Sequence, residues 1–170
     1  LFTGRPLILN WEQDNVPAIL NVWFGGSEAA YAIGDVLFGR VNPSGKLTMS
    51  FPQNVGQIPL YYAHKNTGRP LHDGKWFEKF RSNYLDVTNE PLYPFGFGLS
   101  YTTFAYSDIS LSQSSMDMQG MITASVDVSN TGLLPGGEVV QLYIRDLVGS
   151  TTRPVKELKG FERIYLQPGQ

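Results

Sequence analysis

The sequence predicts two successive structural classes, an α/β layer followed by an all-β domain, with an ordered loop-rich segment between them. Apolar runs flank an amphipathic helical pattern within the first 60 residues, which is typical of alternating strands and helices. Residues 52–100 are rich in Pro, Gly, Asn and aromatic side chains and show little periodicity. After residue 101, short alternating segments recur between turn signals, as in a β-sandwich.

The first part is predicted to contain three strands and one helix. The apolar runs at 6–9 and 18–24 indicate buried strands, and residues 46–51 alternate like a strand before a proline. Between them, apolar residues at 29–37 recur at helical spacing, with Ser27 as the predicted N-cap. The order strand, helix, strand favours a parallel α/β layer.

The loop-rich segment is predicted to be ordered, because its many aromatic residues argue against disorder. Four strands are expected after it, at 104–111, 122–128, 139–144 and 158–166. An immunoglobulin-like sandwich needs about seven strands and ~100 residues, so we expect this one to be incomplete and the protein to continue beyond Gln170. The first residues show neither an initiator Met nor a signal-peptide pattern, which suggests a chain that begins within a longer protein.

The composition excludes several partners. A net charge of -2 provides no basic field for nucleic acid or an anionic membrane. No stretch approaches the ~18 uninterrupted apolar residues of a membrane span. Because cysteine is absent, neither disulfides nor thiolate metal sites can form. We therefore expect no nucleic acid and no membrane among the partners.

Six sequence motifs, in order along the chain, resemble the family 3 glycoside hydrolases of the periplasmic β-glucosidase type. They are GRPL at 4–7, ILNVWFGGSE at 19–28, DVLFGRVNPSGKL at 35–47, NTGRP at 66–70, LYPFGFGLSYT at 92–102 and RPVKELKGF at 153–161. The resemblance implies a fold and a domain plan. Residues 1–60 would be the carboxy-terminal part of the family's α/β sandwich domain, 61–100 a connecting segment, and 101–170 the start of a fibronectin type III-like domain.

The resemblance implies a retaining, exo-acting β-glycosidase that hydrolyses terminal non-reducing β-D-glucosyl residues of an oligosaccharide or β-glucoside. Such enzymes use a carboxylate nucleophile and a carboxyl acid/base. In the family these are an Asp of a preceding barrel domain and a Glu of an earlier loop, and neither motif occurs here. We therefore expect no catalytic residue in this chain, no activity of the chain alone, and no cofactor. Periplasmic or secreted localisation is also implied.

Alternatives remain open. The whole protein could be a β-xylosidase, or the chain could serve as a non-catalytic carbohydrate-binding or interaction module, or it could form a homodimer through its aromatic loop. The loop carboxylates are expected to form surface ion pairs with nearby basic residues, although a hidden catalytic pair among them is an alternative. These carboxylates are Asp73, Glu78, Asp86 and Glu90.

One segment is the best candidate to contact substrate. Aromatic faces stack on sugar rings, while Arg supplies directed hydrogen bonds to hydroxyl groups, so we select Trp76, Phe77, Arg81 and Tyr84. The alternative is that these residues fasten the loop between the two domains. The two histidines, His64 and His72, lie eight positions apart without clustered partners, so no metal site is expected.

Overall fold

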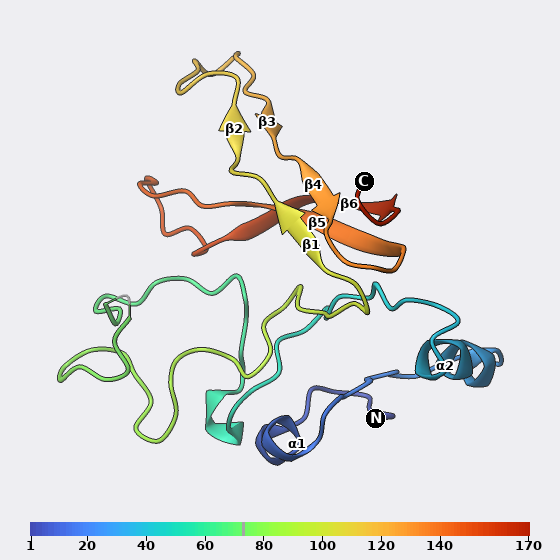
Figure 1. Ribbon diagram of the computed structural model, residues 1–170. Coiled ribbons are helices and arrows are strands. Elements are labelled where there is room, and N and C mark those ends of the chain that lie inside the picture. The colour runs from blue at the N-terminus through green and yellow to red at the C-terminus, as the bar shows by residue number, and fades with distance from the viewer. Residues whose placement is uncertain (73) are drawn as a thin grey trace.

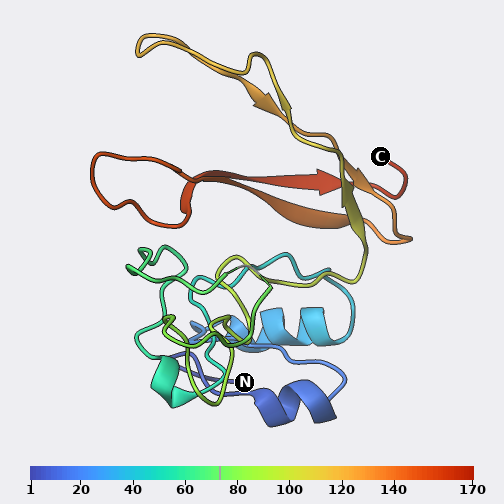
Figure 2. The same cartoon turned by 90° about the vertical axis from the view of Figure 1, so that its left-hand side faces the viewer.

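The computed structural model describes residues 1–72 and 74–170. Two parts lie against each other: a lower part of helices and loops, which includes the connecting segment, and an upper part of strands (Figures 1 and 2). None of the described helices is long and apolar enough to cross a membrane. The elements are α1 (Asn10–Asn15), α2 (Ala29–Leu37), η1 (Val55–Gln57), β1 (Phe104–Tyr106), β2 (Ser110–Leu111), β3 (Ala124–Ser125), β4 (Val128–Asn130), β5 (Gly136–Ile144) and β6 (Glu157–Leu166).

The predicted helix at 29–37 is confirmed as α2. It ends before Gly39, whose φ of 73° lies in the left-handed region that glycine adopts without strain. The predicted cap is wrong: Glu28 occupies the N-cap position and makes no side-chain capping bond. Helix α1 was not predicted, because its six residues include five polar ones and a single Trp, which give no apolar periodicity.

The strands predicted at 6–9, 18–24 and 46–51 are wrong, since none of them is a strand among the described residues. A strand needs a neighbour along its length, and here the backbone pairing is sparse. The amino group of Leu1 donates to Leu20 O at 2.7 Å and Val22 N donates to Leu1 O at 2.9 Å. The apolar runs are therefore irregular chain with isolated backbone hydrogen bonds. The parallel α/β layer remains a prediction.

A small core joins the first part to the connecting segment. Phe51 is 1% exposed, and its ring lies 5.8 Å from that of Trp23 and 6.1 Å from that of Tyr93. The backbones are paired as well, with Phe51 N donating to Tyr93 O at 2.8 Å and Leu92 N donating to Phe51 O at 2.8 Å. Residues about 40 positions apart are therefore held together by one aromatic cluster.

The connecting segment is organised around one buried amide side chain. Gln57 is 1% exposed, and its Nε2 donates to Thr88 O at 2.9 Å and Glu90 O at 3.0 Å. Its Oε1 accepts from Gln53 N, and with Asn54 it forms a capping box at η1. Buried amides of this kind fix irregular chain because every polar group has a partner.

The upper part consists of three antiparallel strand pairs, β1–β4, β2–β3 and β5–β6. The first two form one ribbon, because Ser107 N donates to Asp127 O between them at 2.9 Å. The predicted runs at 104–111 and 122–128 are strand only in part: β1 and β2 lie within the first run, while β3 and the first residue of β4 lie within the second. The runs at 139–144 and 158–166 lie within β5 and β6, which pair from Gly136↔Leu166 to Ile144↔Glu157 with a bulge after Leu142.

Candidate functional site

The four residues selected from the sequence do not form a single site. Trp76 and Phe77 lie side by side on the loop, with ring centroids 6.1 Å apart and exposed fractions of 53% and 45%. Beyond them Phe80 is also exposed, has a φ of 65° and lies under the Lys79 ammonium at 4.9 Å. Left-handed backbone at a bulky residue is uncommon and strained. The loop thus presents three aromatic side chains to solvent.

Arg81 belongs to a polar cluster that fastens the base of this loop. Its guanidinium donates to Pro70 O at 3.3 Å and to Nε2 of His72 at 3.1 Å. Since a guanidinium only donates, Nε2 accepts and the His72 proton lies on Nδ1, 2.9 Å from the Glu78 carboxylate. The hydrogen bonds from the His72 side chain and backbone lower the pKa of Glu78. Arg81 therefore orders the loop in the described chain.

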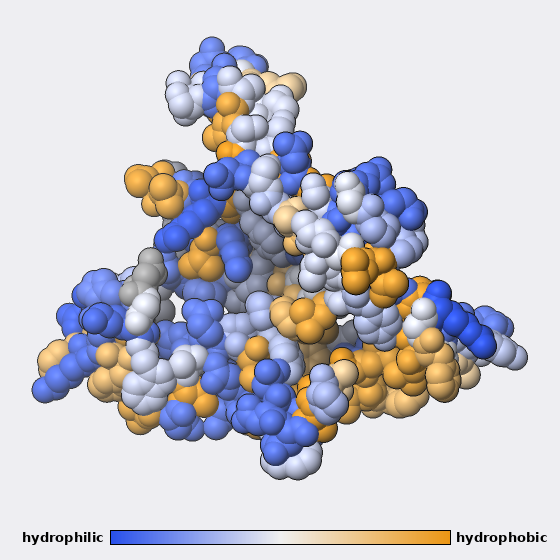
Figure 3. Space-filling view, in the orientation of Figure 1, coloured by the Kyte–Doolittle hydropathy of each residue, from blue (hydrophilic) through white to orange (hydrophobic). Residues whose placement is uncertain are grey.

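Tyr84 lies apart from that cluster, in the wall of a cleft of about 850 Å³. Its hydroxyl donates to Gln57 O at 3.3 Å, which ties it to the buried amide network. The cleft lies between the connecting segment and the loop end of the β5–β6 hairpin, where Ile144 pairs with Glu157. Hydrophilic residues border the hollow on the face shown in Figure 3. Of the four selected residues, only Tyr84 lines this cleft.

Two of the described loop carboxylates, those of Glu78 and Asp86, accept hydrogen bonds. Glu78 is bound to His72, and Asp86 Oδ2 accepts from Asn54 Nδ2 at 3.1 Å. Asp73 lies outside the described residues. Within residues 1–72 and 74–170, no three His, Asp or Glu side chains are grouped as metal ligands would be. The basic side chain that Glu78 contacts is His72; the described ion pairs include none between these carboxylates and the neighbouring Lys75, Lys79 or Arg81, so the expected pairing is not found there.

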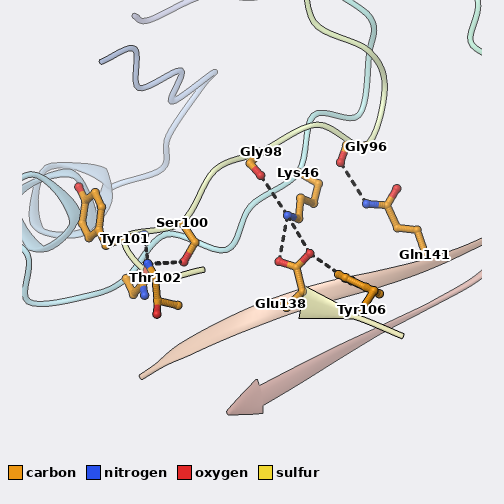
Figure 4. Close-up of polar contacts among 10 residues, drawn as sticks. Lys46, Gly96, Gly98, Ser100, Tyr101, Thr102, Tyr106, Glu138 and Gln141 are labelled. Carbon is orange, nitrogen blue, oxygen red and sulfur yellow. Dashed lines mark hydrogen bonds and ion pairs between the residues drawn. The ribbon is translucent and has the colours of Figure 1, made fainter. Parts of the chain in front are cut away.

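The structure places a second polar site, not predicted from the sequence, where the two parts meet (Figure 4). Lys46 Nζ lies 3.0 Å from Glu138 Oε2 and donates to Gly98 O at 3.0 Å. Tyr106 donates its hydroxyl proton to Glu138 Oε1 at 2.9 Å. Burial, and then the bond to the Glu138 carboxylate, raise the pKa of Tyr106. We call Lys46, Tyr106 and Glu138 the junction triad.

Backbone contacts at the junction explain the GFG sequence at 96–98. Gln141 Nε2 donates to Gly96 O at 3.0 Å, and Gly96 has a φ of 81°. A Cβ on Gly98 would overlap Gly45 O. Glycine is thus required at both positions, once for backbone conformation and once for close approach.

A second set of hydrogen bonds fixes the same junction. Asn42 Nδ2 donates to Pro135 O at 3.1 Å, and its Oδ1 accepts from Tyr101 N at 2.8 Å. Fully buried Asn130 accepts from Thr102 Oγ1 at 2.8 Å. The polar groups of one part therefore meet defined partners in the other. A sequence signal existed only for the turn at 42–45, not for its partners.

These two parts match two known domain families. Residues 1–101 match the glycosyl hydrolase family 3 C-terminal domain, and residues 138–170 match the fibronectin type III-like domain. The first match covers more than half of the chain. The chain therefore belongs to glycosyl hydrolase family 3.

Relatives and solved structures agree with this assignment. All 170 residues of the chain align with the periplasmic β-glucosidase of Salmonella typhimurium at 56% identity. The aligned region makes up 22% of that protein. It is 49% identical to a β-xylosidase of Formosa agariphila, again covering 22% of that protein. A β-glucosidase from Listeria innocua, solved in complex with glucose, superposes with a TM-score of 0.92 at 45% identity over 99% of this chain and 23% of its own. The chain thus spans about a fifth of the length of these relatives.

Proposed function

We propose that the chain is the carboxy-terminal scaffold portion of a retaining, exo-acting β-glycosidase. The activity assigned to the whole protein is hydrolysis of terminal non-reducing β-D-glucosyl residues. The β-glucosidases of Salmonella and Listeria support glucoside as the substrate class. A β-xylosidase is the second candidate, supported by the Formosa relative at 49% identity.

The scaffold role is supported by the large area of surface that the chain exposes. The chain exposes 12592 Å² at a mass of 18.9 kDa. A compact monomer of that mass exposes about 8,300 Å² by the usual scaling of surface with mass. Only Leu9 and Phe51 are fully buried hydrophobic residues among those described. A chain with so little interior gains its stability by packing against further protein.

One apolar area of that surface lies on the helical face. Phe24, Tyr31 and Phe38 are among its exposed large side chains, on and beside α2. In Figure 3 a broad hydrophobic area covers the region of α2. Contiguous exposed apolar surface of this kind marks an interface, here with the remainder of the α/β sandwich domain.

The proposed domain plan divides the chain at residues 60 and 100. Residues 1–60 complete an α/β sandwich domain, 61–100 connect, and 101–170 begin a fibronectin type III-like domain. The end of the first family match at residue 101 supports the second boundary. Trp76 and Phe77 remain the proposed substrate contacts, since both are exposed. Arg81 and Tyr84 are proposed to hold the loop in place through His72 and Gln57.

The periplasm, or the outside of the cell, is the proposed location, and the Salmonella relative supports it. A homodimer through the exposed aromatic loop is the corresponding proposal for assembly. Light scattering of the whole protein with Trp76→Ala and Phe77→Ala tests the dimer. A mass unchanged by these substitutions contradicts it.

Hydrolysis assays test the catalytic proposal. The 170-residue chain and the whole protein that contains it are compared on an aryl β-glucoside and an aryl β-xyloside. We expect turnover by the whole protein only, with the glucoside preferred. Turnover by the 170-residue chain contradicts the scaffold role, and preference for the xyloside selects the second candidate.

A further inference from the structure

The cleft beside Tyr84 has a local charge opposite to that of the whole chain. Its lining includes four basic side chains, Lys65, Lys75, Arg145 and Lys156, against one described carboxylate, Glu90. The chain as a whole carries a net charge of -2. An average over the sequence therefore conceals a positive cleft, in which low-dielectric walls concentrate the field.

Three of these basic residues converge at one end of the cleft. Ile144 pairs with Glu157 at the end of the β5–β6 ladder, so the adjacent Arg145 and Lys156 leave it side by side. Both line the cleft. Lys65 approaches the same place from the connecting segment, because it forms a β-bridge with Pro154.

None of the three forms an ion pair with another described residue. The described ion pairs occur elsewhere, and the nearby Asp146 carboxylate lies 3.9 Å from Arg153. The Lys156 ammonium lies 5.7 Å from the centre of the Tyr143 ring, a contact that leaves its charge uncompensated. Like charges gathered without a counter-ion favour binding of an anion.

The remaining wall is suited to a saccharide. Tyr61 is well exposed and lines the cleft, while Tyr62 stacks on Phe95 with ring centroids 4.1 Å apart. Asn66, which carries a side-chain amide, also lines it. Aromatic faces with a few placed polar groups are typical of ligand pockets, and amides can bond hydroxyl groups in either direction.

The wall is also fixed before any ligand arrives. Val155 N donates to His64 O at 2.9 Å, which joins the connecting segment to the hairpin. Asn89 Nδ2 donates to Ser82 O at 2.9 Å within the segment. A preformed wall reduces the entropy lost on binding.

We propose that this cleft binds an acidic saccharide, a uronate-bearing oligosaccharide. The carboxylate lies between Arg145, Lys156 and Lys65, and a sugar ring contacts Tyr61. The fork of an arginine guanidinium matches a carboxylate in two parallel hydrogen bonds. The proposal goes beyond hydrolysis of β-glucosides and does not depend on it, because binding is measured without turnover.

Calorimetric titration of the whole protein that contains this chain tests the site, with cellobiouronate, inorganic sulfate and neutral maltose, whose α-linkage a β-glycosidase leaves intact, as separate ligands. The cleft variant is Arg145→Gln with Lys156→Gln, and the control is Lys159→Gln, which removes a charge from β6 outside the cleft lining. We expect the cleft variant to weaken cellobiouronate binding at least tenfold and the control to leave it unchanged. Thermal transitions verify that both variants fold.

Two further variants separate the elements of the proposal. Arg145→Lys keeps the charge but loses the fork, so an intermediate affinity is expected. Tyr61→Leu is expected to weaken cellobiouronate binding and leave sulfate binding unchanged. Equal affinity for sulfate and cellobiouronate, equal affinity for neutral maltose and cellobiouronate, or no effect of the cleft variant would overturn the proposal. None of these results bears on whether the aryl β-glucoside is hydrolysed.

Discussion

Removing one partner of the ion pair in the junction triad should destabilise the protein far more than removing an exposed pair of the same length. Lys46 and Glu138 are 3.0 Å apart, and their side chains are 16% and 12% exposed. Lys159 and Glu157 are also 3.0 Å apart, but their side chains are 47% and 42% exposed. The two pairs therefore differ in burial at a constant distance.

The expected magnitude follows from desolvation. Removing one partner of a fully buried pair costs about 3–5 kcal/mol, because the other charge is left without compensation. The Lys46–Glu138 pair keeps some contact with water, so we expect about 2–3 kcal/mol for Lys46→Met or Glu138→Gln. Exposed pairs contribute about 0–1 kcal/mol, which sets the expectation for Lys159→Met.

Urea denaturation of the whole protein that contains this chain measures these differences, with the double variant Lys46→Met, Glu138→Gln closing a cycle. The double variant should be less destabilised than the sum of the two single variants by at least about 1 kcal/mol, because the second substitution removes a charge that is already unpaired. Additive effects, or equal losses for Lys46→Met and Lys159→Met, would refute the reasoning.

Three other predictions concern pH and close packing. Because its pKa is raised above the ordinary value of 10.0, Tyr106 stays protonated longer in the folded state, so stability falls as pH rises above about 10. Tyr106→Phe should remove that part of the alkaline loss, as measured by thermal transitions between pH 8 and 11, and an unchanged pH profile contradicts this. The pKa of Glu78 is lowered from 4.5, so its stabilisation is present above about that pH and declines as the carboxylate is protonated. In Glu78→Gln the thermal stability should vary less with pH between pH 3 and 6 than in the unsubstituted protein. An unchanged dependence of stability on pH in that range would contradict the stabilising bond to His72. Gly98→Ala should destabilise by about 1–3 kcal/mol, because the methyl group would overlap Gly45 O; a neutral effect in urea denaturation would show that the backbone yields there.

Hydrophobic periodicity predicted those elements whose own residues show a clear helical or alternating pattern. Helix α2 follows from apolar spacing, and β5 and β6 follow from long alternating runs. Helix α1 carries no such signal, since all its residues except Trp11 are polar and none is buried. The extended runs at 6–9 and 18–24 do carry a strand signal, but a strand also depends on a neighbour that periodicity does not report.

The candidate sites show the same limit. Aromatic content drew attention to the loop at 76–84, yet of its described aromatic residues only Tyr84 lines the cleft. Arg145 and Lys156 are separated in sequence by a hairpin loop, and their proximity depends on strand register. Lys46 and Glu138 are 92 positions apart, so neither residue alone indicates the other. Sites assembled from distant segments therefore require the fold before they can be recognised.

That long separation also sets an order for synthesis. Asn42 and Lys46 leave the ribosome well before Pro135 and Glu138, their partners across the junction. At about 5–20 residues per second, the roughly 90 intervening residues take several seconds to add. During that interval the Lys46 ammonium remains hydrated, and the first part can settle its own core around Phe51. Attachment of the strand-rich part is therefore a late event in the life of the nascent chain.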